Sequence, residues 1–207
     1  MSSKIQRLCY SMVKCTRIGT TTLFLTALFG CASTEPATER FYTLQPLESN
    51  DNSLRGSVGI EEAELLFNPV SVPSYLAQNG IVTAGIDGKI EWANYHLWAE
   101  LPAVAIKRNL ERCVLRSTRS GIQQQRINVE IHRFQGDGNG GVIFDGTWSS
   151  HKVADNTALG TYLFEYRQPQ IGDGYGALTT ALSKTVEQLC VDILSKTLKA
   201  QPVKAES

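Results

Sequence analysis

The 207-residue chain lacks a hydrophobic run long enough to cross a membrane, because its leading uncharged stretch, residues 20–30, is about half of the ~20 residues required. It has only three histidines, which are far apart and show no metal-ligand spacing. It has no Gly-x-Ser-x-Gly motif and no other arrangement of a nucleophile with a base. The sequence therefore predicts neither a permanent transmembrane helix, nor a metal site, nor an enzyme.

The first thirty residues contain basic side chains and no acidic ones. Lys4, Arg7, Lys14 and Arg17 precede the apolar stretch 20–30, which is the layout of a secretory signal. We therefore expect residues 1–30 to be a signal peptide that is removed on export. The remaining chain has 16 basic and 20 acidic side chains, a balance that argues against nucleic acid as a partner.

The end of the apolar stretch, Leu28-Phe29-Gly30-Cys31, resembles the lipobox of bacterial lipoproteins. The resemblance implies a diacylglycerol on the Cys31 thiol, cleavage before Cys31 and acylation of the new amino group, with no other cofactor. An ordinary secretory signal with an incidental cysteine is the alternative. Several acyl chains hold a protein on a membrane durably, whereas one does so only marginally. Ala32 follows the cysteine where Asp signals inner-membrane retention, so the pattern resembles the outer-membrane default.

The chain after the signal divides into three parts. Residues 31–40 are small and polar and are predicted to be a lipidated tether. Residues 41–198 form a single domain, long enough to bury a sizeable core. Residues 199–207 are polar and are predicted to be a disordered tail.

Hydrophobic periodicity within 41–198 predicts an α+β domain. Alternating or apolar runs predict strands at 41–44, 57–66, 81–86, 89–93, 127–134, 142–153 and 160–166. Helical spacing predicts one turn at 74–76, a helix from about Pro102 until Gly121, and a helix from Tyr175 to Leu198. The dipeptide Asp87-Gly88 favours a type I′ hairpin turn. We expect a mostly antiparallel sheet, with a three-stranded meander and two long helices packed on one face.

Cys113 and Cys190 share helical stripes with aliphatic residues, so both should face the interior. Two explanations remain open, buried free thiols or a disulfide between the helices. Disulfides persist in the periplasm, which favours the bridge.

Two surface features could serve recognition. The first is a basic stripe on the first helix, which is either a solvated face or a contact for anionic headgroups or an acidic partner: Arg108, Arg112 and Arg116. The second is an aromatic group that suits either a partner surface or a core, and the sequence leaves both alternatives open: Trp92, Tyr95 and Trp98.

Several segments, in this order along the chain, resemble one family, the ABC-type transport auxiliary lipoproteins, a PqiC-like group that accompanies MCE-domain lipid transporters. The segments are Phe41-Tyr42-Thr43-Leu44, Val72-Pro73-Ser74-Tyr75-Leu76 with Gly80-Ile81-Val82-Thr83, Ile90-Glu91-Trp92 with His96-Leu97-Trp98-Ala99-Glu100, Val129-Glu130-Ile131-His132-Arg133-Phe134 and Tyr175-Gly176-Ala177-Leu178. One departure is Leu101 before Pro102, where the family has Pro before Leu.

The resemblance implies a non-enzymatic adaptor on the periplasmic face of the outer membrane, with an MCE-domain protein of an ABC lipid transporter as its partner. MCE proteins form rings, so a homo-oligomer of this lipoprotein is compatible with that partnership. Two other hypotheses remain, a carrier that binds lipid or another apolar ligand in its own cavity, and a structural envelope lipoprotein.

Overall fold

The computed structural model describes residues 37–45, 62–117 and 119–199. The predicted signal peptide, Cys31 and most of the predicted tether lie outside the described residues. The same holds for residues 57–61 of the second predicted strand and for 200–207 of the predicted tail. Within the described residues, no helix is both long and apolar enough to cross a membrane.

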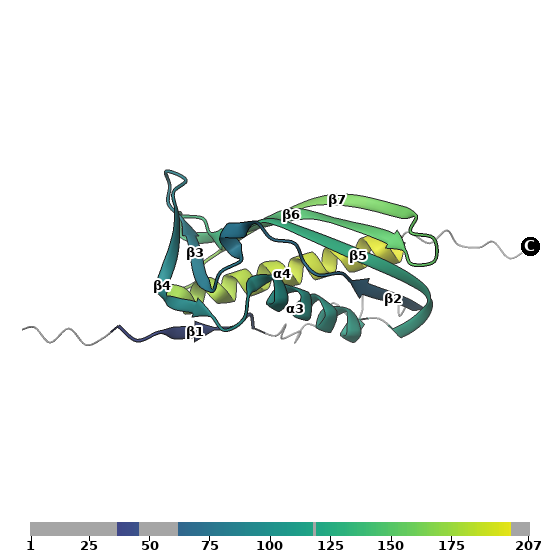
Figure 1. The fold of residues 1–207 in the computed structure, drawn as a ribbon, viewed down its shortest axis with the longest axis horizontal. Helices are drawn as coiled ribbons and strands as arrows, with labels where there is room; N and C mark the ends of the chain where they lie inside the picture. The colour runs from purple at the N-terminus through teal and green to yellow at the C-terminus, as the bar shows by residue number, and fades with distance from the viewer. Residues whose placement is uncertain (1–36, 46–61, 118, 200–207) are drawn as a thin grey trace, which may run out of the picture. The chain divides into compact units, whose positions relative to one another are not determined.

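The described elements follow one another as strands, a helix, three strands and a final helix (Figure 1). They are β1 (Arg40–Tyr42), β2 (Glu62–Phe67), the 3-10 turn η2 (Ser74–Leu76), β3 (Gly80–Ala84), β4 (Ile90–Trp98), α3 (Pro102–Ser117), β5 (Arg119–Gly136), β6 (Gly141–Lys152), β7 (Ala158–Pro169) and α4 (Gly174–Lys199).

The seven strands of the described residues form one mixed sheet, so the α+β class is confirmed and the expectation of a mostly antiparallel sheet is wrong. The order is β1-β4-β3-β5-β6-β7, with β2 beside β5. Pairs β1–β4, β2–β5 and β3–β5 are parallel, whereas β3–β4, β5–β6 and β6–β7 are antiparallel. The cause is the 18-residue length of β5. One edge of β5 pairs with β6, and its other edge pairs first with β2 and then, at Thr83 and Gly136, with β3.

The meander β5–β6–β7 is confirmed, with strands that extend beyond their predicted bounds. The β5–β6 turn is closed by Asp137, whose Oδ1 accepts hydrogen bonds from the backbone N–H groups of Asn139 and Gly141. Gly138 has φ +75°, and a Cβ there would lie 2.4 Å from the carbonyl oxygen of Ala84. This glycine therefore lets the β5–β6 turn approach the backbone of the β3–β4 hairpin.

The helices form where apolar residues recur every three or four positions. In α3 the buried stripe includes Ile106, Leu110 and Cys113, and Pro102 occupies the first position, where its missing N–H costs no helical hydrogen bond. The helix ends at Ser117, before the predicted stop at Gly121, because the following residues join β5.

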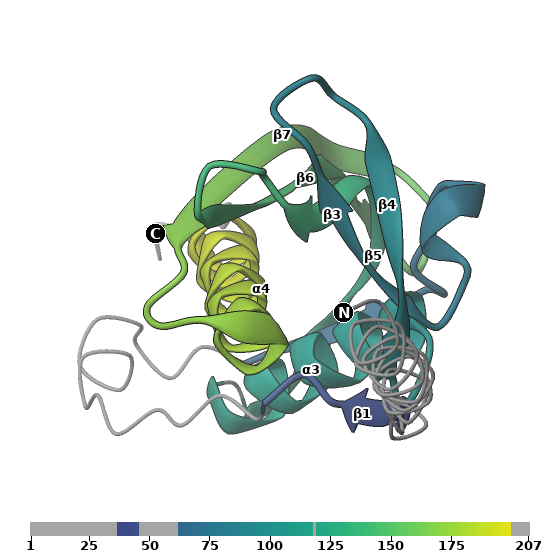
Figure 2. The same cartoon turned by 90° about the vertical axis from the view of Figure 1, so that its left-hand side faces the viewer.

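One hydrophobic core contains residues of both helices and of the sheet. Figure 2 shows α3 and α4 within the curve of the sheet. The largest fully buried side chains of the core come from β5, β6, α3 and α4, among other elements: Trp148, Phe134, Phe144, Leu76, Ile81, Ile106, Leu110, Ile127, Ile131, Leu182, Leu189 and Ile193.

Candidate interaction surfaces

Strand β1, which begins at the last residue of the predicted tether, and the residues just after it are fastened to the domain at several points. The hydroxyl of Tyr42 lies 2.8 Å from Nδ1 of His96 on β4, and the His96 ring stacks on Tyr175 of α4 with centroids 4.1 Å apart. Leu44 is buried, and the backbone N–H of Gln45 donates to a serine hydroxyl of α4 at 3.0 Å. A pull on the tether would therefore be resisted by both β4 and α4.

The structure joins Cys113 of α3 to Cys190 of α4 through a disulfide, with Cα atoms 6.5 Å apart. Both cysteines are buried in the core between the helices. The bridge would fix α3 against α4, and alkylation of the unfolded, unreduced protein tests it.

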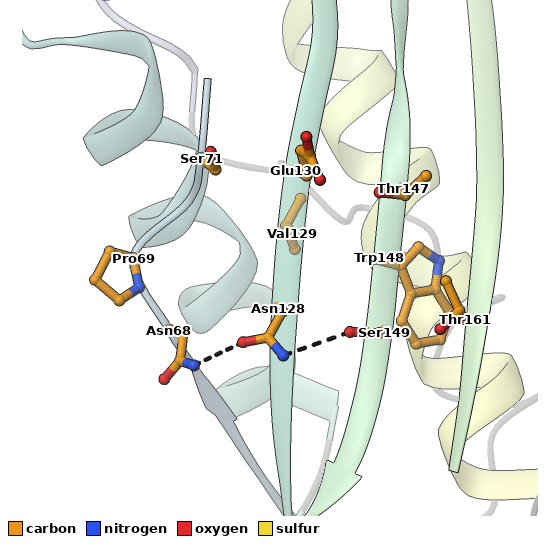
Figure 3. Close-up of a pocket in the computed structure, with 10 residues that line it drawn as sticks. All are labelled: Asn68, Pro69, Ser71, Asn128, Val129, Glu130, Thr147, Trp148, Ser149 and Thr161. Atoms are coloured by element: carbon orange, nitrogen blue, oxygen red, sulfur yellow. Dashed lines mark hydrogen bonds between the residues drawn. The ribbon is translucent and has the colours of Figure 1, made fainter. Parts of the chain in front are cut away.

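A hollow of about 510 Å³ lies on the outer side of the sheet (Figure 3). The outward Asn128 and Glu130 of β5 alternate with inward, buried Val129 and Ile131, so the hollow faces away from the core. Ten residues line it: Asn68, Pro69, Ser71, Asn128, Val129, Glu130, Thr147, Trp148, Ser149 and Thr161.

The chemistry of this hollow is that of hydrogen bonding. Asn68 Nδ2 donates to Asn128 Oδ1 at 2.6 Å, and Asn128 Nδ2 donates to the Ser149 hydroxyl at 3.4 Å (Figure 3). Glu130 is the ionisable residue of the lining, and no histidine or cysteine belongs to it. The hollow therefore offers amides and hydroxyls to a polar group and has no nucleophile with a positioned base.

Beside the hollow, an ionic network crosses the outer side of the three meander strands. Arg133 Nε donates to Asp145 Oδ2 at 2.6 Å, Arg133 Nη2 lies 3.5 Å from Glu165, and Glu165 pairs with Arg167 at 2.9 Å. The hydrogen bond to Asp145 raises the pKa of Arg133, and burial raises the pKa of the adjacent Tyr75 hydroxyl. Every carboxylate of this network has a cationic neighbour, so the arrangement holds strands together and suits no acid–base chemistry.

Among the described residues, buried side chains of both helices and of the sheet pack together in one core. An aromatic series runs through it, with centroids 5.9 Å apart for Trp98 and Phe134, 5.1 Å for Phe134 and Phe144, and 5.0 Å for Phe144 and Phe164. Such edge-to-face and stacked contacts are typical of a close-packed core. A carrier would need an apolar cavity in this position.

The aromatic residues singled out in the sequence separate into two kinds. Trp98 is 2 % exposed and belongs to the core, whereas Trp92 and Tyr95 are 42 % and 48 % exposed. In the basic stripe, Arg108 pairs with Glu100, so this part of the stripe is not a free cationic surface. Among the described residues, no three His, Cys, Asp or Glu side chains are placed to hold a metal ion.

Sequence reasoning missed the contact of His96 with Tyr175 and the polar hollow. The histidine contact joins residues on β4 and α4, and no local pattern marks such a pair. The hollow depends on the chain at 68–71, which runs beside β5 through hydrogen bonds from the backbone of Asn68 and Ser71. The sequence shows a proline at position 69, but it does not show that residues 68–71 lie beside β5.

The described part of the chain is therefore an α+β domain with a mixed sheet, two long helices and an N-terminal strand that is fastened to β4. The chain belongs to the family described as "ABC-type transport auxiliary lipoprotein component", whose model matches residues 42–194.

Among its relatives is the "Intermembrane transport lipoprotein PqiC" of Escherichia coli (strain K12), which is 31% identical over 175 residues, covering 80% of this chain and 89% of that protein. PqiC of Shigella flexneri matches to the same extent. A crystal structure of a Xanthomonas campestris protein shares the fold, with a TM-score of 0.67 and 12% identity over 78% of this chain and 95% of that one. Another crystal structure, of an uncharacterized protein, has a TM-score of 0.63 and 23% identity over 77% and 99% of the two chains.

Proposed function

We propose that this chain is a periplasmic lipoprotein, anchored in the outer membrane through Cys31, that acts as the adaptor of an MCE-type ABC lipid transporter. The observation that carries the proposal is the family match over residues 42–194, together with 31% identity to a protein named as an intermembrane transport lipoprotein. The pattern Leu28-Phe29-Gly30-Cys31 supports the anchor.

The physical argument starts from the cargo. A lipid that moves between two membranes needs an apolar path through water, because exposed acyl chains are costly to hydrate. Each end of such a path must be held at its membrane. A domain with several acyl chains at its N-terminus and a short tether meets this need at the outer end, since several chains make attachment durable.

The packed interior favours the adaptor over the carrier. The space between the sheet and the helices holds large buried side chains, and the hollow on the outer side is lined mainly by amides and hydroxyls. Neither feature suits the acyl chains of a lipid. We therefore place the protein's contribution in docking and in position, with no chemical step and no cofactor besides the covalent lipid.

Co-purification with the MCE-domain protein of the same organism tests the adaptor function. The mature lipoprotein and the MCE protein are co-expressed, extracted in mild detergent and isolated through a tag on the MCE protein. We expect the lipoprotein to be retained, and an unrelated outer-membrane lipoprotein with the same signal peptide to be lost. Equal loss of both would contradict the adaptor.

Mass spectrometry of lipids extracted from the same purified lipoprotein separates the two remaining hypotheses. An adaptor with a packed core carries no stoichiometric lipid besides the covalent acyl groups. One extractable phospholipid per chain, retained through gel filtration without detergent, would favour the carrier.

A further inference from the structure

Four exposed apolar side chains lie along β4, from the tip of the β3–β4 hairpin that precedes it to β1, which pairs with its last residues. Phe41 is 60 % exposed, Ile86 is 84 % exposed, and Trp92 and Tyr95 of β4 are 42 % and 48 % exposed. Phe41 pairs with Leu97, and Tyr95 lies two positions before Leu97, so Phe41 and Tyr95 project to the same side of the ladder. We call these four residues the β1–β4 apolar set.

The direction of β1 links this set to the tether. Strand β1 is parallel to β4, and β4 begins at the β3–β4 hairpin. The chain that arrives from the tether therefore enters from the hairpin side of the domain. Figure 1 shows β1, β4 and this hairpin at the same end of the sheet, whereas the last turns of α4 lie at the other end.

The length of the tether limits the distance to the membrane. Nine residues lie between Cys31 and Phe41, and the ten steps of the chain between the two Cα atoms, at ~3.3–3.6 Å each, span at most about 35 Å when fully extended. A less extended tether keeps Phe41, at the β1 end of the set, still closer to the lipid. This part of the inference rests on the proposed anchor at Cys31.

The chemistry of the set suits a bilayer interface. Tryptophan and tyrosine are enriched where the headgroups meet the acyl chains, because each combines an apolar ring with a polar tip. The indole Nε1 of Trp92 donates to the carbonyl oxygen of Tyr75 at 2.9 Å, which orients the ring. Nearby, Lys89 and Glu91 form an ion pair at 2.9 Å, so these two charges balance each other beside the set.

We propose that the β1–β4 apolar set rests in the headgroup region of the same bilayer that holds the lipid on Cys31. The tether limits the distance of the domain from the membrane, and this contact would also fix its orientation. The sheet edge at β7 and the far ends of α3 and α4 would then face the periplasm, where a transport partner can reach them.

Tryptophan fluorescence tests the contact without an added probe. The chain has three tryptophans, of which Trp98 and Trp148 are buried at 2 % and 1 % exposure, so that Trp92 alone is accessible. The mature lipidated protein is reconstituted into vesicles of phosphatidylcholine or of brominated phosphatidylcholine, and flotation verifies attachment. We expect brominated lipid to lower the emission by on the order of one third, since one of three indoles reaches the interface. The emission of the Trp92→Phe variant should be the same in brominated and in ordinary phosphatidylcholine.

A labelled pair adds a matched control. Two separate variants, Ile86→Cys and Leu163→Cys, each carry the same environment-sensitive dye on the new thiol. Leu163 lies on β7 and is 81 % exposed, about as exposed as Ile86, so it serves as the control position. Quenching by brominated lipid should be roughly threefold stronger for the dye at position 86.

Each other outcome has a defined meaning. Unquenched Trp92 in protein that floats with the vesicles overturns the bilayer contact and leaves the anchor intact. Failure to float overturns both. Protection of Trp92 from acrylamide without quenching by brominated lipid assigns the set to a second copy or another protein, and also overturns the proposal.

Discussion

The bridge between Cys113 and Cys190 gives a quantitative prediction for stability. The cysteines are 77 residues apart, and closing a loop of this length in the unfolded chain stabilises the native state by about 4.5 kcal/mol in the chain-entropy model. For a domain of this size, that loss corresponds to a fall in Tm of roughly 10–15 °C.

Three variants distinguish the bridge from two buried thiols. If the bridge is present, Cys113→Ala and Cys190→Ala each lose nearly the whole effect, and the double variant loses little more, because either change opens the loop. Two independent buried thiols would instead give small losses that add. Thermal unfolding followed by circular dichroism, at equal protein concentration and without reductant, measures the three differences.

Alkylation gives the chemical control. Unfolded under non-reducing conditions and treated with iodoacetamide, the mature wild-type protein should show no modified cysteine in the domain by mass spectrometry, and two after reduction. Two modified cysteines without reduction, or an unchanged Tm in both single variants, would refute the reasoning.

Three further predictions concern packing, titration and the attachment of β1. Gly146→Ala places a Cβ 2.1 Å from a backbone oxygen of β5, so the urea midpoint should fall by an amount equivalent to about 1–3 kcal/mol or more. The control is Gly176→Ala on α4, whose added Cβ would have no neighbouring atom within 4 Å and which should be neutral or stabilising. Burial and the Asp192 carboxylate raise the pKa of Tyr166 above the ordinary value of 10.0, so above pH 10 the phenol ionises in the unfolded chain but not in the folded one, and the free energy of unfolding should fall as the pH rises. The urea midpoint of Tyr166→Phe should fall less over the same pH range than that of the wild-type protein. Tyr42→Phe removes the hydrogen bond to the β4 histidine and should cost about 0.5–1.5 kcal/mol, with faster amide exchange confined to β1.

Local patterns predicted the parts of the fold that depend on neighbours in sequence. The alternation of 127–134 and the glycine-rich turn after it indicated the β5–β6 hairpin, and the spacing of Leu182, Leu189 and Ile193 indicated α4. The parallel pairs could not be predicted in this way. Whether β2 and β3 run with β5 or against it depends on how residues 68–79 and α3 return the chain, and alternation is the same in either direction.

The same limit applies to single residues of β4. Trp92 and Trp98 have similar local surroundings in sequence, yet one is exposed and the other is buried. The register between β3 and β4 shifts between Gly80 and Val82, where two steps on β3 correspond to five on β4. Such an irregularity changes which side chains face inward, and it leaves no periodic signal of its own.

Membrane fractionation of the wild-type chain and of Cys31→Ser tests the central claim, that this domain works by being held at the outer membrane. The account predicts wild-type protein in the outer-membrane fraction, with mass spectrometry showing acyl groups on Cys31. It predicts Cys31→Ser absent from the outer-membrane fraction, with an unchanged Tm of the domain, since Cys31 lies before the first strand of the domain. Cys31→Ser that remains in the outer-membrane fraction would contradict the account.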